Sequence, residues 1–269
     1  MKLSFSTRGW PGMGWEEMMD TAVEMGFSGI EVYNLPKFDP MLDRGGPFHK
    51  YQTAATVRQL RDKKLQIPCF DTSCDLSDAE DPTAALLSLM EVAVNTRVPY
   101  VVACALQDNE TLVKQRLEVL LSRAEALGVG ILLKTSGIYA DTARLRSMMD
   151  MFASDFLGAL WDVHHPYRDL GESADATIKN LGTYVRHVHL RDSDDDGSYN
   201  LIGEGTLPVK DMVRALSSIN YDGFISLEWK PEWMEDLTDR EIIFPHFVNY
   251  MSRFNNPRTR KKSLYYNHD

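Results

Sequence analysis

Cysteine is scarce in this sequence, and positive charge and long apolar runs are also in short supply. Three cysteines, Cys69, Cys74 and Cys104, occur among 269 residues, and no two of them have the CxxC spacing. An odd number of thiols without that spacing argues against a disulfide framework and against a thiolate zinc site. We therefore expect free and mostly buried thiols, which favours a reducing compartment such as the cytoplasm.

The charge balance and the hydropathy exclude two classes of partner. Acidic residues outnumber basic ones by 39 to 29, for a net charge of −10, whereas a nucleic-acid partner requires a basic face. The basic cluster NPRTRKK at residues 256–262 is typical of a solvated tail. No apolar run approaches the ~20 residues of a membrane span. The chain enters a strand-like run at once, so no signal peptide is expected.

Short apolar runs alternate with longer amphipathic segments. Eight runs are short and apolar, as buried parallel strands are: residues 3–6, 29–33, 66–70, 100–105, 130–134, 157–161, 185–190 and 223–229. Eight helix candidates accompany them: residues 14–26, 53–64, 81–96, 109–128, 141–153, 173–182, 208–220 and 237–254. This alternation, in a length near the about 250 residues of such a barrel, favours an α/β fold of the single-domain (β/α)8 TIM barrel type over a doubly wound sheet.

No shift in composition marks an internal domain boundary. Residues 1–254 are predicted to form the barrel domain, and residues 255–269 a C-terminal tail or linker. The sequence leaves open both a homo-oligomer and an additional C-terminal domain.

The first polar residues after the apolar runs are the candidates for function, because barrel active sites lie at the C-terminal ends of the strands. They are Ser6, Thr7, Arg8, Glu31, Asp71, Thr72, Cys104, Lys134, Asp162, His189 and Glu228. Asp162, His189 and Glu228 supply two carboxylates and one imidazole from three successive strands. Such a set suits Mn, Mg, Fe or Zn, and the missing thiolate argues against a structural zinc. We therefore predict a divalent metal on these three residues, with positions left open for a substrate.

Histidine and tryptophan residues near the same strand ends are further candidates. His165 lies three positions beyond Asp162 and is predicted to bond a substrate hydroxyl or to shuttle a proton. His187 shares a side of its strand with His189 and is expected to be a packed barrel histidine. Trp229 follows a strand end directly, where an indole either stacks on a sugar ring or packs into the core.

The acidic segment DSDDDGSYNLIGE at residues 192–204 nearly matches a calcium-binding loop. Its first acidic residues have the right offsets, but the twelfth position is Gly203 and Glu204 comes one residue late. A strand rather than a helix precedes the segment. We therefore predict a solvated acidic loop and no calcium site.

At these residues the chain resembles the xylose-isomerase-like barrel superfamily, the sugar phosphate isomerase/epimerase group. The likeness covers almost the whole chain and is carried by GFSGIEVY, WDVHH, HVHLRD, IGEGTLPVKDMVRAL and YDGFISLEW. The resemblance implies a (β/α)8 barrel with a divalent metal at its mouth and an activity on sugars, keto-sugars or inositols. In that family the metal is typically held by Glu, Asp, His and Glu from strands five to eight.

The resemblance implies roles for particular residues. The last three of the family's four ligands correspond to Asp162, His189 and Glu228, and in the epimerase branch the two metal-bound glutamates also move the substrate proton. His165 corresponds to a substrate-contacting histidine, and Glu31 to a common polar position after strand two. The candidates for substrate binding are Arg8, Glu31, His165, Trp229 and Glu204.

The first of the four family ligands falls at Lys134, where this sequence departs from the family. The two following residues, Thr135 and Ser136, supply no carboxylate. The departure is therefore real unless a distant acid such as Glu204 reaches the site.

Three interpretations of Lys134 compete. In the first, the metal stays on the other three ligands, and Lys134 acts as an acid or base of lowered pKa or holds an anionic substrate group. In the second, the ammonium replaces the metal and pairs with Asp162 and Glu228. In the third, Lys134 is a Schiff-base nucleophile, which requires a depressed pKa. A lysine that points out of the mouth would do none of these.

Two functions from different classes follow. The first is a sugar phosphate isomerase/epimerase-like enzyme that abstracts a proton next to the carbonyl of a small sugar, keto-sugar or polyol, with metal assistance and with Glu228, Lys134 and His165 as catalytic residues. A dehydratase would use the same step. The second is a metal-free carbohydrate-binding or regulatory barrel, as one domain of a longer polypeptide, because a fold alone does not establish activity.

Overall fold

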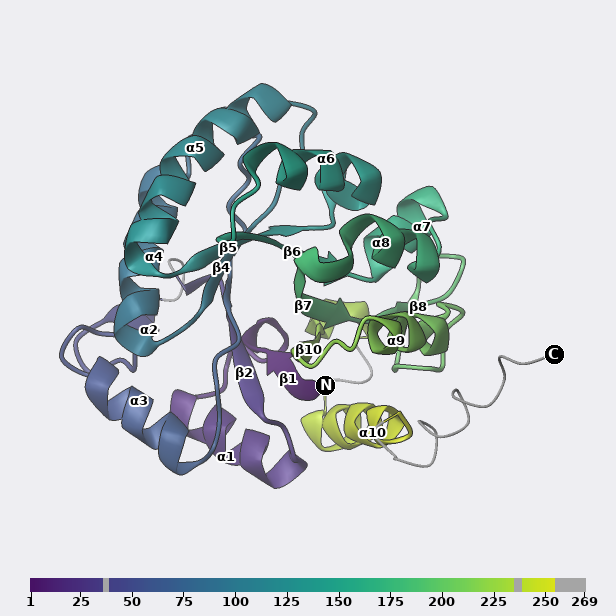
Figure 1. The fold of residues 1–269 in the computed structure, drawn as a ribbon. Coiled ribbons are helices and arrows are strands. Elements are labelled where there is room, and N and C mark those ends of the chain that lie inside the picture. Colours follow the sequence, from purple (N-terminus) through teal and green to yellow (C-terminus); the bar gives the residue numbers. More distant parts are fainter. Residues whose placement is uncertain (36–38, 235–238, 255–269) are drawn as a thin grey trace.

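Eight parallel strands close into a barrel in the computed structural model, which describes residues 1–35, 39–234 and 239–254. Their order around the barrel is β1, β2, β3, β4, β5, β6, β7, β10 and back to β1 (Figure 1). They are β1 (Lys2–Ser6), β2 (Gly29–Tyr33), β3 (Phe70–Asp71), β4 (Tyr100–Ala103), β5 (Gly130–Lys134), β6 (Leu157–Asp162), β7 (Val185–Leu190) and β10 (Phe224–Leu227). The predicted (β/α)8 barrel is confirmed.

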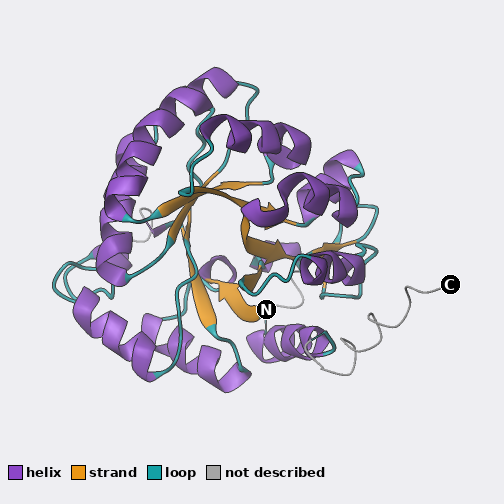
Figure 2. Cartoon of the chain, in the orientation of Figure 1, coloured by secondary structure: helices purple, strands orange, loops and turns teal. Residues whose placement is uncertain are grey.

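The longer helices form a layer around the barrel (Figure 2). They are α1 (Trp15–Met25), α3 (Thr53–Asp62), α4 (Thr83–Thr96), α5 (Glu110–Leu127), α6 (Thr142–Phe152), α8 (Ala174–Leu181), α9 (Val209–Ser218) and α10 (Arg240–Ser252). Each lies within its predicted range. Helices α1 and α5 end at Gly26 and Gly128, whose φ angles of +83° and +69° are in the left-handed region that favours glycine.

Several short elements were not expected from the sequence pattern, because each is too short to show a clear periodicity. They are α2 (Asp39–Leu42), α7 (His164–Leu170), the strands β8 (Asp192–Ser193) and β9 (Tyr199–Asn200), and the 3₁₀ turns η1 (Thr7–Gly9), η3 (Gly137–Ala140), η4 (Gly182–Tyr184) and η5 (Pro231–Trp233). The predicted tail at residues 255–269 lies outside the described residues.

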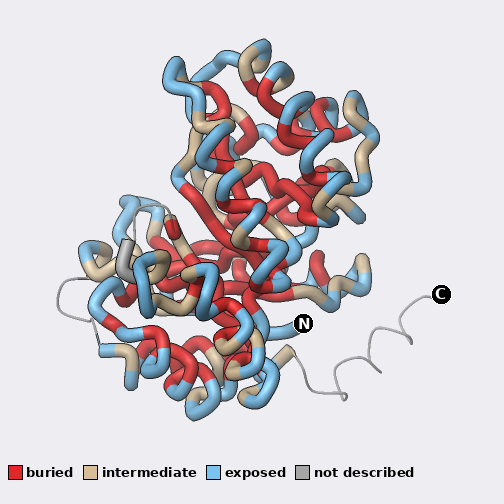
Figure 3. Tube along the Cα trace, turned by 90° about the vertical axis from the view of Figure 1, so that its left-hand side faces the viewer, coloured by how far each residue is buried: buried red, intermediate tan, exposed pale blue. Residues whose placement is uncertain are grey.

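The strands bury both of their faces. Toward the helices they contribute Phe5, Ile30 and Trp161 to a large apolar core, and the buried trace runs through the middle of the molecule in Figure 3. Toward the barrel axis lies a small apolar cluster of Cys69, Val102, Leu132 and Leu160. On the opposite side of the axis the interior is polar, and the hydroxyl oxygens of Ser4 and Ser226 are 2.7 Å apart. The barrel interior therefore has an apolar half and a polar half.

Two glycines make room for aromatic rings at the N-terminal end of the barrel. A Cβ atom at Gly29 would lie 2.6 Å from Phe224 Cε1, and one at Gly130 would lie 2.9 Å from Tyr100 Cδ1. Neither position has space for a side chain, so the rings fill this end of the interior.

The free thiols are as expected, since Cys69 and Cys104 are buried and Cys74 is half-buried, with no disulfide among them. Within the three described ranges, no helix combines the length and the apolar character that crossing a membrane requires.

The acidic segment after β7 is a short hairpin of β8 and β9. Asp192 is 1 % exposed, and its carboxylate accepts backbone N–H bonds from Gly203, Gly205 and Leu207 at 2.8, 3.1 and 3.2 Å. The prediction of a solvated acidic loop is therefore wrong at this residue. Asp192 anchors the following loop because its oxygens replace backbone partners that a strand would supply.

Replacing Asp192 by alanine is expected to lower the free energy of unfolding by about 2–3 kcal/mol, because several buried N–H groups lose their acceptor. Urea denaturation measures this. The control is Asp196→Ala on the exposed tip of the same hairpin, for which we expect a loss below about 0.5 kcal/mol. Equal losses for the two variants would contradict the anchoring role.

Candidate functional site

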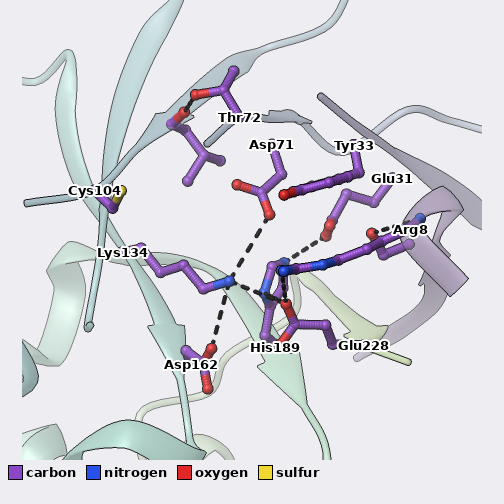
Figure 4. Close-up of polar contacts among 12 residues, drawn as sticks. Arg8, Glu31, Tyr33, Asp71, Thr72, Cys104, Lys134, Asp162, His189 and Glu228 are labelled. Atoms are coloured by element: carbon purple, nitrogen blue, oxygen red, sulfur yellow. Dashed lines mark hydrogen bonds and ion pairs between the residues drawn. The ribbon is translucent and has the colours of Figure 1, made fainter. Parts of the chain in front are cut away.

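The C-terminal ends of the strands bring the predicted polar residues to one mouth (Figure 4). Lys134 ends β5, Asp162 ends β6, and Glu228 directly follows β10. Asp162 is in register with His189 of β7. The side chains converge because alternate residues of a barrel strand point toward the axis.

The ammonium of Lys134 lies among three carboxylates. Its Nζ is 3.2 Å from Glu228 Oε1, 3.5 Å from Asp162 Oδ2 and 3.9 Å from Asp71 Oδ2 (Figure 4). Burial lowers the pKa of Lys134, but Glu228, Asp71 and Asp162 raise it, and the net pKa lies above the usual value. An acid/base lysine and a Schiff-base lysine both require a lowered pKa. The geometry therefore favours the interpretation in which the ammonium pairs with the carboxylates.

Two arginines complete the ion-pair cluster. The Arg191 guanidinium bridges Asp162 and Glu228, with Nη2 at 3.1 Å from Asp162 Oδ2 and Nη1 in contact with Glu228 Oε2. Arg8 Nη1 donates to Glu228 Oε1 at 3.0 Å. Burial raises the pKa of Glu228, but Arg191, Lys134, His189 and Arg8 hold it well below the usual value. Glu228 is therefore a weak proton acceptor in this arrangement.

Sequence reasoning missed Arg191. It lies two residues beyond His189, so the alternation of a strand would have placed it on the same side. The rule that selects the first polar residue after each apolar run stops at the histidine and does not reach Arg191.

Glu31 lies below the mouth, inside the barrel, and is fully buried. Its Oε2 accepts hydrogen bonds from His187 Nε2 at 2.7 Å and from His189 Nε2 at 2.8 Å. Burial raises the pKa of Glu31, but His189 and His187 bring it well below the usual value. This carboxylate therefore orients the two imidazoles through Oε2, while its buried Oε1 has no hydrogen-bond partner among the described residues. His187 is 1 % exposed, as expected of a packed barrel histidine.

The other nitrogen of His189 is available. With Nε2 bonded to Glu31, Nδ1 is buried, has no hydrogen-bond partner among the described residues, and lies 3.9 Å from Glu228 Oε1. The imidazole thus presents one free nitrogen toward the mouth.

His165 lies at the rim of the mouth, in α7. Its Nδ1 is 2.9 Å from Asp169 Oδ2, and its Nε2 is 3.9 Å from Asp162 Oδ2. About a third of the side chain, 31 %, is exposed. Its position next to Asp162 suits the predicted contact with a substrate hydroxyl.

An aromatic wall stands beside the same rim. The ring of Tyr199 stacks on Trp233 at 4.0 Å and lies 5.5 Å from the ring of His164. The Arg191 guanidinium lies 5.4 Å from the centre of the Trp233 ring. The Trp233 ring therefore adds a cation–π contact to the ion pairs of Arg191.

Two predicted substrate contacts do not lie at the mouth. Trp229 is 3 % exposed and belongs to the apolar core, because Glu228 faces the axis and the next residue faces the opposite side. Glu204 has a 57 % exposed side chain, and its carboxylate lies 3.9 Å from His246 of α10. It therefore does not replace the carboxylate missing at position 134.

Asp71 ends β3 and was a strand-end candidate without an assigned role. It is 1 % exposed, and its Oδ1 has no hydrogen-bond partner in the described ranges. Burial raises the pKa of Asp71 to about 6, although Lys134 and His189 lower it. Asp71 therefore combines an oxygen without a hydrogen-bond partner with a raised pKa.

Comparisons with known proteins agree with the barrel fold. A model of the family described as xylose isomerase-like TIM barrel matches residues 19–244. Fructoselysine 3-epimerase of Escherichia coli O157:H7 is 23 % identical over 264 residues, which cover 88 % of this chain and 93 % of the relative.

Two solved structures share the fold. The IOLI protein, solved with a bound zinc atom, aligns with a TM-score of 0.77 and 17 % identity over 94 % of this chain and 99 % of its own. D-psicose 3-epimerase, solved in the presence of D-fructose, aligns with a TM-score of 0.76 and 14 % identity over 94 % and 99 %. Proteins with this barrel thus include one that binds a metal and one solved with a sugar.

Proposed function

Because this chain belongs to the xylose isomerase-like TIM barrel family, we propose that it is an enzyme that moves a proton next to the carbonyl of a small sugar or keto-sugar. The observation that carries the proposal is the meeting of a free carboxylate oxygen on Asp71 with the cations of Lys134 and Arg191 at one mouth. A relative that is 23 % identical is named fructoselysine 3-epimerase, which supports the same reaction class.

The chemistry needs a base and a positive charge. When the base removes a proton from the carbon next to a carbonyl, the electron pair moves to the carbonyl oxygen and an enediolate forms. The developing oxyanion is stabilised by preorganised cations, which Lys134 and Arg191 supply. Asp71 is the proposed base, because a general base works best with a pKa near the operating pH. Returning a proton to the same face of the same carbon gives the starting sugar, and delivery to the opposite face gives an epimer. Protonation of the former carbonyl carbon, with movement of a hydroxyl proton from the neighbouring oxygen to the oxyanion, gives an isomer.

Glu228 and His165 have different roles in this proposal. Glu228 is strongly ionised and bonded to Arg8, Lys134 and Arg191, so it positions the cations. His165 at the rim is the second group that can exchange a proton with a substrate hydroxyl.

A divalent metal fits this mouth poorly while Lys134 is protonated. The described residues offer two groups of three possible ligand atoms within 4.8 Å of one another, Glu31 with His187 and His189, and Asp71 with His189 and Glu228. In the first group, Glu31 is hydrogen-bonded to both histidines. In the second group, Glu228 is hydrogen-bonded to the Lys134 ammonium. An ion about 4 Å from the ammonium would be repelled by about 8 kcal/mol at an effective dielectric constant of about 20. No step of the proposed reaction therefore uses a metal.

The substrate class is proposed as a keto-sugar or a keto-sugar derivative, since hydroxyl groups can bond to the polar rim and a carbonyl can face the cations. The free thiols support a cytoplasmic location as part of this proposal, and the proposed assembly is a homo-oligomer or a chain with an additional C-terminal domain.

The test is proton exchange in deuterated water. The protein is incubated with fructoselysine, D-fructose and D-psicose in turn, and ¹H NMR follows the signal of the carbon-bound proton next to the carbonyl. We expect exchange at least about 100-fold faster than in buffer for one of these sugars. A dehydratase would show the exchange followed by loss of a hydroxyl group. A folded protein that exchanges none of the three and binds none of them would contradict the proposal.

One observation favours a second candidate function, a non-catalytic carbohydrate-binding barrel. Asp162 and Glu228 are both engaged by Lys134 and Arg191, so the cluster is closed on itself. Calorimetry with the same sugars discriminates the two, because binding without proton exchange supports the second function.

A further inference from the structure

The Lys134 ammonium is a positive charge that the chain itself carries to the point where the carboxylates of the mouth converge. We propose that it is the permanent cation of the site, that it takes the place a divalent ion would occupy, and that the protein therefore acts without a metal. The inference deepens the proposed function but is testable without a substrate. It further implies that removing this ammonium uncovers a set of metal ligands.

The first argument is the arrangement of oxygens around Nζ. Glu228 Oε1, Asp162 Oδ2 and Asp71 Oδ2 lie at 3.2, 3.5 and 3.9 Å from the nitrogen. The contact with Glu228 is a hydrogen bond and the other two are ion pairs, whereas oxygen ligands lie about 2.0–2.6 Å from a hard divalent ion. The lysine holds the three carboxylates around one point and at the wrong distance for an ion.

The second argument is the unused nitrogen of His189. Its Nε2 donates to Glu31, and its Nδ1 is buried without a hydrogen-bond partner among the described residues, on the side that faces Glu228. A metal-ligating histidine has its far N–H bonded to a carboxylate in this way. A nitrogen donor is therefore oriented toward the mouth, and the ammonium keeps an ion from it.

The third argument is the balance of charge. The carboxylates of Asp71, Asp162 and Glu228 face the cations of Lys134, Arg191 and Arg8, three against three. A divalent ion added to this cluster would leave it with an excess of two positive charges. Lys134→Met removes one positive charge from the cluster. Lys134→Glu replaces a positive charge by a negative one and leaves an excess of two negative charges, which a divalent ion would neutralise.

The test measures Mn²⁺ binding to the full chain after treatment with a chelator. Free Mn²⁺ is quantified by EPR for the wild type, Lys134→Met and Lys134→Glu, with Lys210→Glu as a control of equal charge change on the exposed face of α9. We expect no stoichiometric binding to the wild type or to the control. We expect one ion per chain in Lys134→Glu, at least about 100-fold tighter than in the wild type, and weaker binding in Lys134→Met.

The controls separate this inference from the proposed function. Adding His189→Gln to Lys134→Glu is expected to abolish the gained binding, and circular dichroism checks that each variant is folded. One Mn²⁺ bound by the wild type and lost in His189→Gln would overturn the inference and leave the proton-transfer proposal standing. A folded Lys134→Glu variant that binds no tighter than Lys210→Glu would overturn it as well. If Lys134→Glu does not fold, the wild type compared with Lys134→Met decides.

Discussion

Replacing Lys134 by methionine is expected to lower the free energy of unfolding by about 3–5 kcal/mol at pH 7, because removing one partner of a buried ion pair leaves charge uncompensated. Only 11 % of the lysine side chain is exposed, and its three carboxylate neighbours are nearly inaccessible to water. Arg8 and Arg191 remain in the variant and limit the loss. Urea denaturation at pH 7 measures the difference.

The pH dependence follows from the raised pKa of Lys134. A lysine whose pKa is higher in the folded chain contributes its full stability below the unfolded pKa, and this is lost only as the pH rises through the folded value. The difference in the free energy of unfolding between the wild type and Lys134→Met should thus be constant from pH 7 to 9. It should be smaller in acid, where carboxylates such as Asp71 become protonated. Lys210→Met is the control, with an expected change within about 0.5 kcal/mol. If Lys134→Met lost as little stability as the control, the ammonium would not hold the cluster together.

Replacing Asp71 by asparagine is expected to slow proton exchange into the substrate by about 10²–10⁴-fold, the usual contribution of a general base. Asparagine keeps the shape of the side chain and removes the proton acceptor. The NMR exchange measurement described above applies directly, with Asp222→Asn before β10 as the matched control on an exposed aspartate. An exchange rate equal to that of the wild type would remove Asp71 from the mechanism.

The wild-type exchange rate should also rise with pH through about 6, where Asp71 loses its proton, and this rise should be missing in Asp71→Asn. Since the pKa of Asp71 is raised in the folded chain by burial, its contribution to stability is present below the unfolded pKa and is lost as the pH rises to about 6. Activity and stability therefore respond to this group in opposite directions. A merely structural Asp71 would change stability without moving the pH profile.

The strands and the longer helices were predictable because their apolar periodicity is strong. The strands β5 and β6 are nearly continuous apolar runs, as strands buried on both faces are, whereas β7 carries Arg186, His187 and His189 between its apolar residues. The short helix α7 was not predictable, since seven residues show too little periodicity.

The candidate site was predictable only as a set of strand ends. The position of Lys134 among carboxylates was one of three interpretations, and only the distances distinguish it from the others. The burial of Trp229 follows from strand alternation, because its neighbour Glu228 faces the axis. The prediction of a substrate contact used only its position after a strand end. The burial of Glu31 and the raised pKa of Asp71 depend on how far the folded chain removes each carboxylate from water. No linear pattern encodes this.

The most direct test of the central claim is a crystal structure of the wild-type protein soaked in Mn²⁺, with anomalous diffraction recorded at the manganese edge. The account predicts that the Lys134 ammonium lies within hydrogen-bonding range of Glu228 and close to Asp162, with no anomalous peak in the mouth. A strong peak coordinated by His189 and Glu228, with the lysine turned away, would contradict it.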